Sequence, residues 1–168
     1  MSAVLEAPRV SASTQAQSRS TSSPSVATGT FLCLVVSANP QRREQFVGAA
    51  QQAGWDTAVC RDGLAGATAA RRTRFQLALV DLEGLSGERQ AEMRDLSGQL
   101  AGSSGLLLTV CGNEGDGLEE IWARQLGAWM YLPGVTADCD LTMVCQEALP
   151  VAARLNQREV PARRSAIA

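Results

Sequence analysis

The sequence of 168 residues contains no histidine and no lysine, and all fifteen of its basic residues are arginines. Without histidine the chain has no imidazole to serve as a general base, a metal ligand or a phosphotransfer residue. Without lysine it has no Schiff-base nucleophile and no lysine of a phosphate-binding P-loop. These two absences exclude most familiar enzyme mechanisms, and we expect that the chain is not an enzyme.

The chain also lacks a large excess of charge, a long apolar run and closely spaced cysteines. Its net charge of −2 gives no basic footprint for a nucleic acid, so we expect no nucleic-acid partner. No segment approaches the roughly 18 apolar residues of a membrane span, so we expect no membrane insertion. Its five cysteines form no CxxC pair, which predicts a reducing compartment such as the cytoplasm and no structural metal. We interpret three arginine clusters as solvated helix surface: Arg42-Arg43, Arg71-Arg72-Arg74 and Arg163-Arg164.

The composition divides the chain into one domain and two tails. Residues 1–29 are rich in Ser, Thr, Ala and Gln without a helical or strand period, which predicts a disordered tail. Residues 30–155 carry regular apolar patterns and are numerous enough for one domain with its own core. Residues 156–168 lose the pattern, and we expect a flexible C-terminal tail there.

Short apolar runs alternate with amphipathic segments throughout the domain. Strands are predicted over 31–36, 55–60, 75–80, 106–111 and 129–132, and helices over about 40–53, 62–74, 88–100, 118–126 and 137–155. In the fourth helix, Leu118, Ile121, Trp122 and Leu126 recur at the spacing of an apolar face. The alternation predicts an α/β fold, a doubly wound five-stranded parallel sheet between two layers of helices.

In an open sheet of this kind, ligands bind beyond the carboxyl ends of the strands. The residues that end the strands there include Asp81 after the third strand and the segment 109–111 in the fourth. No Gly-rich loop follows the first strand, so neither a dinucleotide fingerprint nor a P-loop is present. Asp81 is therefore the main candidate for chemistry at this edge.

Two segments carry a resemblance to a known family. The run Phe75-Gln-Leu-Ala-Leu-Val-Asp81-Leu and the run Leu126-Gly-Ala-Trp-Met-Tyr-Leu-Pro133 resemble the receiver domain of bacterial two-component response regulators, over residues 31–155. The resemblance implies the (βα)5 flavodoxin-like fold. It also implies an acidic pair after the first strand, a phosphoacceptor aspartate after the third, a hydroxyl after the fourth and a lysine after the fifth.

This chain keeps only part of that set. Asp81 matches the phosphoacceptor, but Ser37-Ala38 stands where the acidic pair would hold magnesium, and Gly134 stands where the lysine would be. The hydroxyl position falls at Thr109 or, judged by its distance from Asp81 in the sequence, at Cys111. Because phosphoryl transfer depends on charge neutralisation by the metal and cationic donors, their loss predicts a degenerate pseudo-receiver without a cofactor.

Our leading hypothesis is a signalling module of this degenerate form that acts by protein–protein interaction, with a protein partner or as a homodimer. The resemblance implies an interface on the fourth helix, fifth strand and fifth helix. Aromatic residues are typical anchors of interfaces. Candidates in that region are Trp122, Trp129 and Tyr131, with Met143 beside them.

Three other hypotheses are compatible with the sequence. In the first, the chain is a working receiver in a phosphorelay, and Asp81 accepts a phosphoryl group with Glu83, Asn39 or Asn113 as unusual magnesium ligands. In the second, Asp81 is structural and caps a loop or pairs with an arginine. The third uses Cys111 as an enzyme nucleophile, which the absence of a histidine base disfavours.

Overall fold

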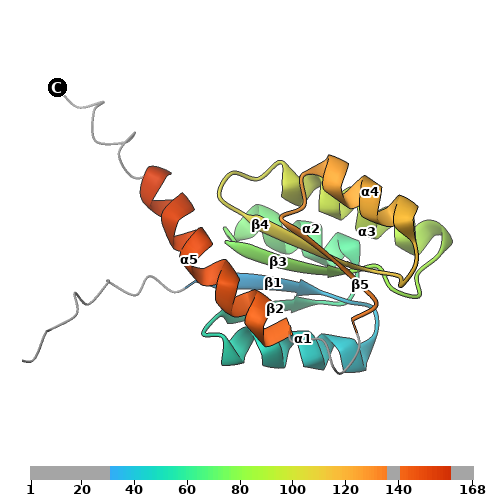
Figure 1. The fold of residues 1–168 in the computed structure, drawn as a ribbon, viewed down its shortest axis with the longest axis horizontal. Helices are drawn as coiled ribbons and strands as arrows, with labels where there is room; N and C mark the ends of the chain where they lie inside the picture. The colour runs from blue at the N-terminus through green and yellow to red at the C-terminus, as the bar shows by residue number, and fades with distance from the viewer. Residues whose placement is uncertain (1–30, 136–140, 160–168) are drawn as a thin grey trace, which may run out of the picture.

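The computed structural model describes residues 31–135 and 141–159. Within these residues, one parallel sheet has the strand order β2-β1-β3-β4-β5, and five helices alternate with its strands (Figure 1). The strands are β1 (Leu32–Val36), β2 (Asp56–Cys60), β3 (Leu77–Asp81), β4 (Leu107–Gly112) and β5 (Met130–Pro133). The helices are α1 (Pro40–Gln52), α2 (Gly63–Arg72), α3 (Gly87–Ala101), α4 (Gly117–Leu126) and α5 (Leu141–Glu159). The predicted doubly wound fold is confirmed.

The sheet separates the core into two layers, because successive side chains of a strand point to opposite faces. In β1, Cys33 and Val35 join the core beneath α1 and α5, whereas Leu34 and Val36 join the core beneath α2, α3 and α4. All four side chains are fully buried. Figure 1 shows the same division, with α1 and α5 on one side of the sheet and the other helices opposite.

Local signals fix where the helices begin and end. The side chain of Asn39 accepts hydrogen bonds from the backbone N–H groups of Gln41 and Arg42, and Pro40 takes the first helical position of α1. Asp62 caps α2 in the same way, through the backbone N–H of Ala65 at 2.7 Å. Asparagine and aspartate are among the residues preferred at N-caps, and proline is preferred at the first helical position.

The last helix differs in part from the prediction. It extends to Glu159 instead of ending near Leu155, because Leu155 still packs against the core and no glycine or proline interrupts the four residues after it. The indole Nε1 of Trp55 donates to the backbone oxygen of Cys145 at 2.9 Å. This hydrogen bond links α5 to the residue that precedes β2.

The predicted disordered tail, the predicted helix start at Ala137 and the residues after 159 lie outside the described residues. No helix among those described is both long and apolar enough to cross a bilayer.

The inward face of α4 is only in part the apolar face predicted from the sequence, because Trp122 and Leu126 pack against the core and the other two residues do not. Leu118 is 80% exposed and Ile121 is 53% exposed, whereas Glu119 and Ala123 are fully buried. The prediction was wrong because periodicity assumes that the charged residues of a helix face solvent. Here a carboxylate faces inward and two large apolar side chains face outward.

Candidate functional site

Asp81 ends the central strand β3 at the carboxyl edge of the sheet. Its neighbour in the register of β4 is Cys111, and β1 lies on its other side. The chain leaves β1 toward α1 on one face and leaves β3 toward α3 on the other, which makes this the topological switch point of the sheet. Asp81 is only 2% exposed, so its carboxylate needs partners within the protein.

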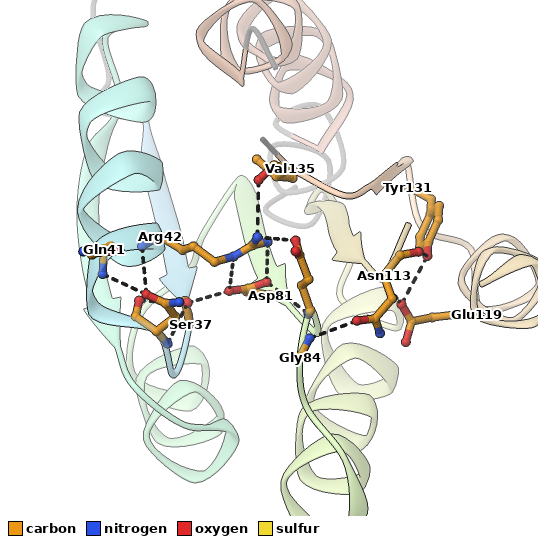
Figure 2. Close-up of polar contacts among 11 residues, drawn as sticks. Ser37, Gln41, Arg42, Asp81, Gly84, Asn113, Glu119, Tyr131 and Val135 are labelled. Carbon is orange, nitrogen blue, oxygen red and sulfur yellow. Dashed lines mark hydrogen bonds and ion pairs between the residues drawn. The ribbon is translucent and has the colours of Figure 1, made fainter. Parts of the chain in front are cut away.

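The main partner of Asp81 is the guanidinium of Arg42, in the first turn of α1 (Figure 2). Arg42 Nε donates to Oδ2 of Asp81 at 2.9 Å, and Nη2 donates to Oδ1 at 2.8 Å. This is the two-pronged geometry in which an arginine matches a carboxylate best. The third nitrogen, Nη1, contacts the carboxylate of Glu83 and donates to the backbone oxygen of Val135 at 3.3 Å.

Two further donors complete the surroundings of Asp81. The hydroxyl of Ser37 donates to Oδ2 at 2.6 Å, and the backbone N–H of Glu83 donates to Oδ1 at 3.2 Å. Each carboxylate oxygen therefore accepts one hydrogen bond from Arg42 and one from another group. Burial alone would lower the pKa of Arg42, but its hydrogen bonds to Asp81 and the charges of Asp81 and Glu83 raise that pKa above its ordinary value. The guanidinium is a permanent cation at this site.

The interpretation of Arg42 as surface was wrong, since its side chain is 13% exposed and engaged on every nitrogen. The structural role considered for Asp81, pairing with an arginine or capping a loop, is present in the structure in both forms. No motif marks Arg42, because it stands among other polar residues at a helix start. The only signal in the sequence was indirect: a buried carboxylate at this edge needs a cation, and the chain has no lysine.

The receiver resemblance implies a magnesium ion beside Asp81, but the residues present do not fit one. Ser37 and Ala38 offer no carboxylate, and Glu83 is occupied by Arg42. Asn39 uses its side-chain oxygen to cap α1, and Asn113 uses its own to accept from the backbone N–H of Gly84 at 2.9 Å. Within 31–135 and 141–159, no three acidic, histidine or cysteine side chains are grouped to hold a metal. A hard divalent cation prefers several free oxygen ligands. At this site the cation beside Asp81 is the guanidinium of Arg42.

The two candidates for the hydroxyl position lie at different depths. Cys111 is the register neighbour of Asp81, whereas Thr109 is paired with Leu79, two residues deeper in the sheet. Both are fully buried, and the Thr109 hydroxyl has no hydrogen-bond partner among the described residues. The position beside Asp81 is therefore that of a thiol.

Glycine at the lysine position has a structural reason. The backbone of Gly134 has a φ of 58°, in the left-handed region, and a Cβ there would lie 2.9 Å from the Cβ of Glu114. A longer side chain would require the segment after β5 to shift. The cation beside Asp81 comes instead from Arg42 on α1.

A second polar cluster, which the sequence did not predict, surrounds the buried carboxylate of Glu119 (Figure 2). Its Oε1 accepts from the backbone N–H of Asn113 at 2.9 Å and from the hydroxyl of Tyr131 at 3.1 Å. Its Oε2 accepts from Gln90 at 3.3 Å and faces Arg94 at 3.6 Å. Burial and the charge of Glu119 raise the pKa of the Tyr131 hydroxyl, so the phenol stays neutral. The cluster ties α4 to α3, β4 and β5.

The three aromatic interface candidates are all partly buried. Trp122 packs against the core beneath α3 and α4, with the guanidinium of Arg94 4.7 Å from the centre of its ring. Trp129 packs against the opposite core, and Tyr131 directs its hydroxyl inward to Glu119. The large exposed apolar side chains of this region are instead Leu118, Ile121 and Met143.

No family model matches the sequence, and no curated protein matches it. Solved structures do resemble the fold. The chain is similar to a CheY-like response regulator receiver domain protein of Methanospirillum hungatei, with a TM-score of 0.62 and 12% identity over 77% of this chain and 98% of that one. It is also similar to the chemotaxis response regulator CheY4 of Vibrio cholerae, with a TM-score of 0.59 and 16% identity over 71% and 98%. An orphan response regulator of H. pylori gives 0.59 and 14% over 74% and 98%. The chain therefore has the fold of response regulator receiver domains.

Proposed function

We propose that this chain is a receiver-like signalling module that acts by binding a protein partner and does not carry out magnesium-dependent phosphotransfer. The observation that carries the proposal is the two-pronged contact of Arg42 with Asp81. A phosphoacceptor must present one carboxylate oxygen to the incoming phosphorus atom. In this chain both oxygens are occupied by donors of the protein itself.

The energetics of phosphoryl transfer support the same reading. Catalysis of this reaction is almost entirely positioning and stabilisation of charge by metal ions and cationic donors. Removal of a single electrostatic donor typically costs about 3 kcal/mol, or a hundredfold in rate. The chain has neither the acidic pair nor the lysine, and Arg42 is committed to Asp81 before any phosphodonor arrives.

The first test is intact-mass analysis after incubation with acetyl phosphate and magnesium. We expect no phosphoryl adduct on this chain under conditions that label an ordinary receiver domain to completion. An Asp81→Asn variant serves as the control for adducts at other residues. An adduct that is present in the natural chain and absent from Asp81→Asn would instead establish the alternative, a receiver that accepts a phosphoryl group on Asp81.

The outward face of α4 supports the interaction half of the proposal. Leu118 and Ile121 lie one helical turn apart and are both more than half exposed, so two large apolar side chains are neighbours on this surface. Glu120 and Arg124 flank them with opposite charges and are themselves exposed. A face that carries both signs is self-complementary about a two-fold axis, so we propose a second copy of the chain as the partner.

We expect the average mass in solution to rise from 17.7 kDa toward twice that value as the protein is concentrated. The double variant Leu118→Ser/Ile121→Ser should stay monomeric over the same range in sedimentation equilibrium. Leu64→Ser is the matched control, because Leu64 is 70% exposed on α2 and should leave association unchanged. A monomer at every concentration would contradict self-association and assign the α4 face to a different protein.

A further inference from the structure

A cleft of about 430 Å³ opens at the carboxyl edge of the sheet, beside the Asp81 site. Its walls come from three connections, those between β1 and α1, β2 and α2, and β3 and α3. Asp81 does not line it. The volume falls in the range of small-molecule sites, about 300 to 1,000 Å³, and the cleft lies at the β1/β3 switch point where open α/β sheets bind ligands.

Three guanidinium groups line the cleft, each from a different connection or helix. Arg43 is held by a hydrogen bond from its Nη1 to the backbone oxygen of Ser37 at 2.8 Å. Arg61 and Arg89 make no hydrogen bond or ion pair with any residue that the structure describes, although both line the same cleft. Two cations without a protein partner therefore face one concave site from separate elements.

The two carboxylates of the cleft form no ion pair with these arginines in the part of the chain that the structure describes. Asp62 accepts from the backbone N–H of Ala65 at 2.7 Å, and Glu92 accepts from the backbone N–H of Leu64 at 2.6 Å. Both carboxylates thus satisfy the first turn of α2, where the helix dipole favours negative charge. The three guanidinium groups outnumber them, and a net positive charge is left at the cleft.

The rest of the lining is apolar. Ala38, Leu85 and Met93 contribute to it, and Met93 is 2% exposed. The site therefore combines a cationic rim with a small apolar wall, as is typical of sites for organic anions.

We propose that this cleft binds a small phosphate-bearing molecule, either free phosphate or a phosphate monoester. The planar fork of arginine matches phosphate oxygens, and a phosphate dianion offers three terminal oxygens to donors that converge from three sides. A monoester would in addition place its organic part on the apolar wall. The inference goes beyond the proposed function and is independent of it, since it needs neither Asp81 nor a protein partner.

The test is isothermal titration of the full chain with inorganic phosphate and with phenyl phosphate, at constant ionic strength. We expect saturable binding to one site, weakened at least tenfold in the double variant Arg61→Gln/Arg89→Gln. The matched control is Arg71→Gln/Arg72→Gln, which removes the same charge from two exposed arginines in the last turn of α2 and should stay within twofold of the natural chain. Because all four side chains are exposed, the variants should fold normally, which circular dichroism will check.

The two ligands separate the two sources of phosphate. Equal affinity for both would identify free phosphate as the ligand, whereas tenfold tighter binding of phenyl phosphate would identify a monoester that uses Leu85 and Met93. The proposal is overturned if neither ligand gives saturable heat. It is equally overturned if the control variant loses as much affinity as Arg61→Gln/Arg89→Gln, since binding would then follow total charge and not the cleft. Labelling of Asp81 by acetyl phosphate would bear on the proposed function alone and leave this result unchanged.

Discussion

Replacing Arg42 by alanine should lower the free energy of unfolding by about 3 kcal/mol at neutral pH, the scale of breaking a buried ion pair. The loss is large because Asp81 is 2% exposed and stays behind without its cation. Ser37 and the backbone N–H of Glu83 would still donate to Asp81, but neither carries a charge. Urea unfolding followed by tryptophan fluorescence measures the change.

A surface pair provides the control for this experiment, which is carried out at a concentration where the chain is monomeric. Arg124 and Glu120 form an ion pair at 2.7 Å on α4, with side chains 72% and 40% exposed, and Arg124→Ala should cost the monomer about 0.5 kcal/mol or less. In a double-mutant cycle, Arg42→Ala and Asp81→Asn should fall short of additivity by more than about 1 kcal/mol, because both variants remove the same contact. Equal losses at Arg42 and Arg124 would mean that the buried pair stabilises no more than a screened one, and the account of the site would fail.

The contact between Arg42 and Asp81 supplies the positive charge that a buried carboxylate needs. The carboxylate at the end of β3 lies between two neighbouring strands and is 2% exposed, so a cation beside it offsets the cost of its burial. In this chain the cation belongs to α1 and is present at all times. A modification that adds negative charge to Asp81 would first have to displace the guanidinium of Arg42. Such a modification and the stability of the fold would then depend on the same contact.

Most of the fold could be predicted from the sequence because its signals are local. The strands other than β2 are short apolar runs, and the strands are followed by turns or caps such as Asn39 or Asp62 that begin a helix. The observed strands begin within two residues of the predicted ones. The placement of Asp81 followed from the same pattern, since the end of a buried parallel strand has one position relative to the sheet edge.

The partners of the site could not be predicted in this way. Arg42 and Glu119 are charged residues on helices, and a periodic pattern assigns such residues to solvent. Their burial depends on groups far away in the sequence, Asp81 for the first and Tyr131 for the second. The prediction for Leu118 was wrong in the opposite direction, because its apolar side chain was assigned to the core but is exposed. Whether a charged residue is buried depends on its partner in the tertiary structure, so the sequence pattern of a single helix does not show it.

The buried carboxylate of Glu119 gives the second large effect that we expect. Glu119→Ala should lower the free energy of unfolding by about 3 kcal/mol, because the N–H of Asn113 and the amide of Gln90 lose this acceptor. The hydroxyl of Tyr131 keeps only the backbone oxygen of Asn113, at 3.3 Å. Each buried donor without a partner costs about 1 to 3 kcal/mol, partly relieved where water can enter. Glu119→Gln keeps one acceptor oxygen and should lose less. Glu120→Gln, which changes the exposed neighbour on the same helix, should cost about 0.5 kcal/mol or less.

The pH dependence of the free energy of unfolding tests the electrostatic effect of Glu119 on Tyr131 separately from the packing of the cluster. Because burial and the charge of Glu119 raise the pKa of Tyr131 in the folded chain, the unfolded chain releases the phenolic proton first, near its ordinary pKa of about 10. The stabilisation is complete below that pH and is lost as the pH rises toward the folded pKa. Unfolding free energies measured from pH 8 to 11 should therefore fall more steeply for the natural chain than for Tyr131→Phe. Identical slopes would show that the pKa of Tyr131 is not raised and that Glu119 does not act on the phenol.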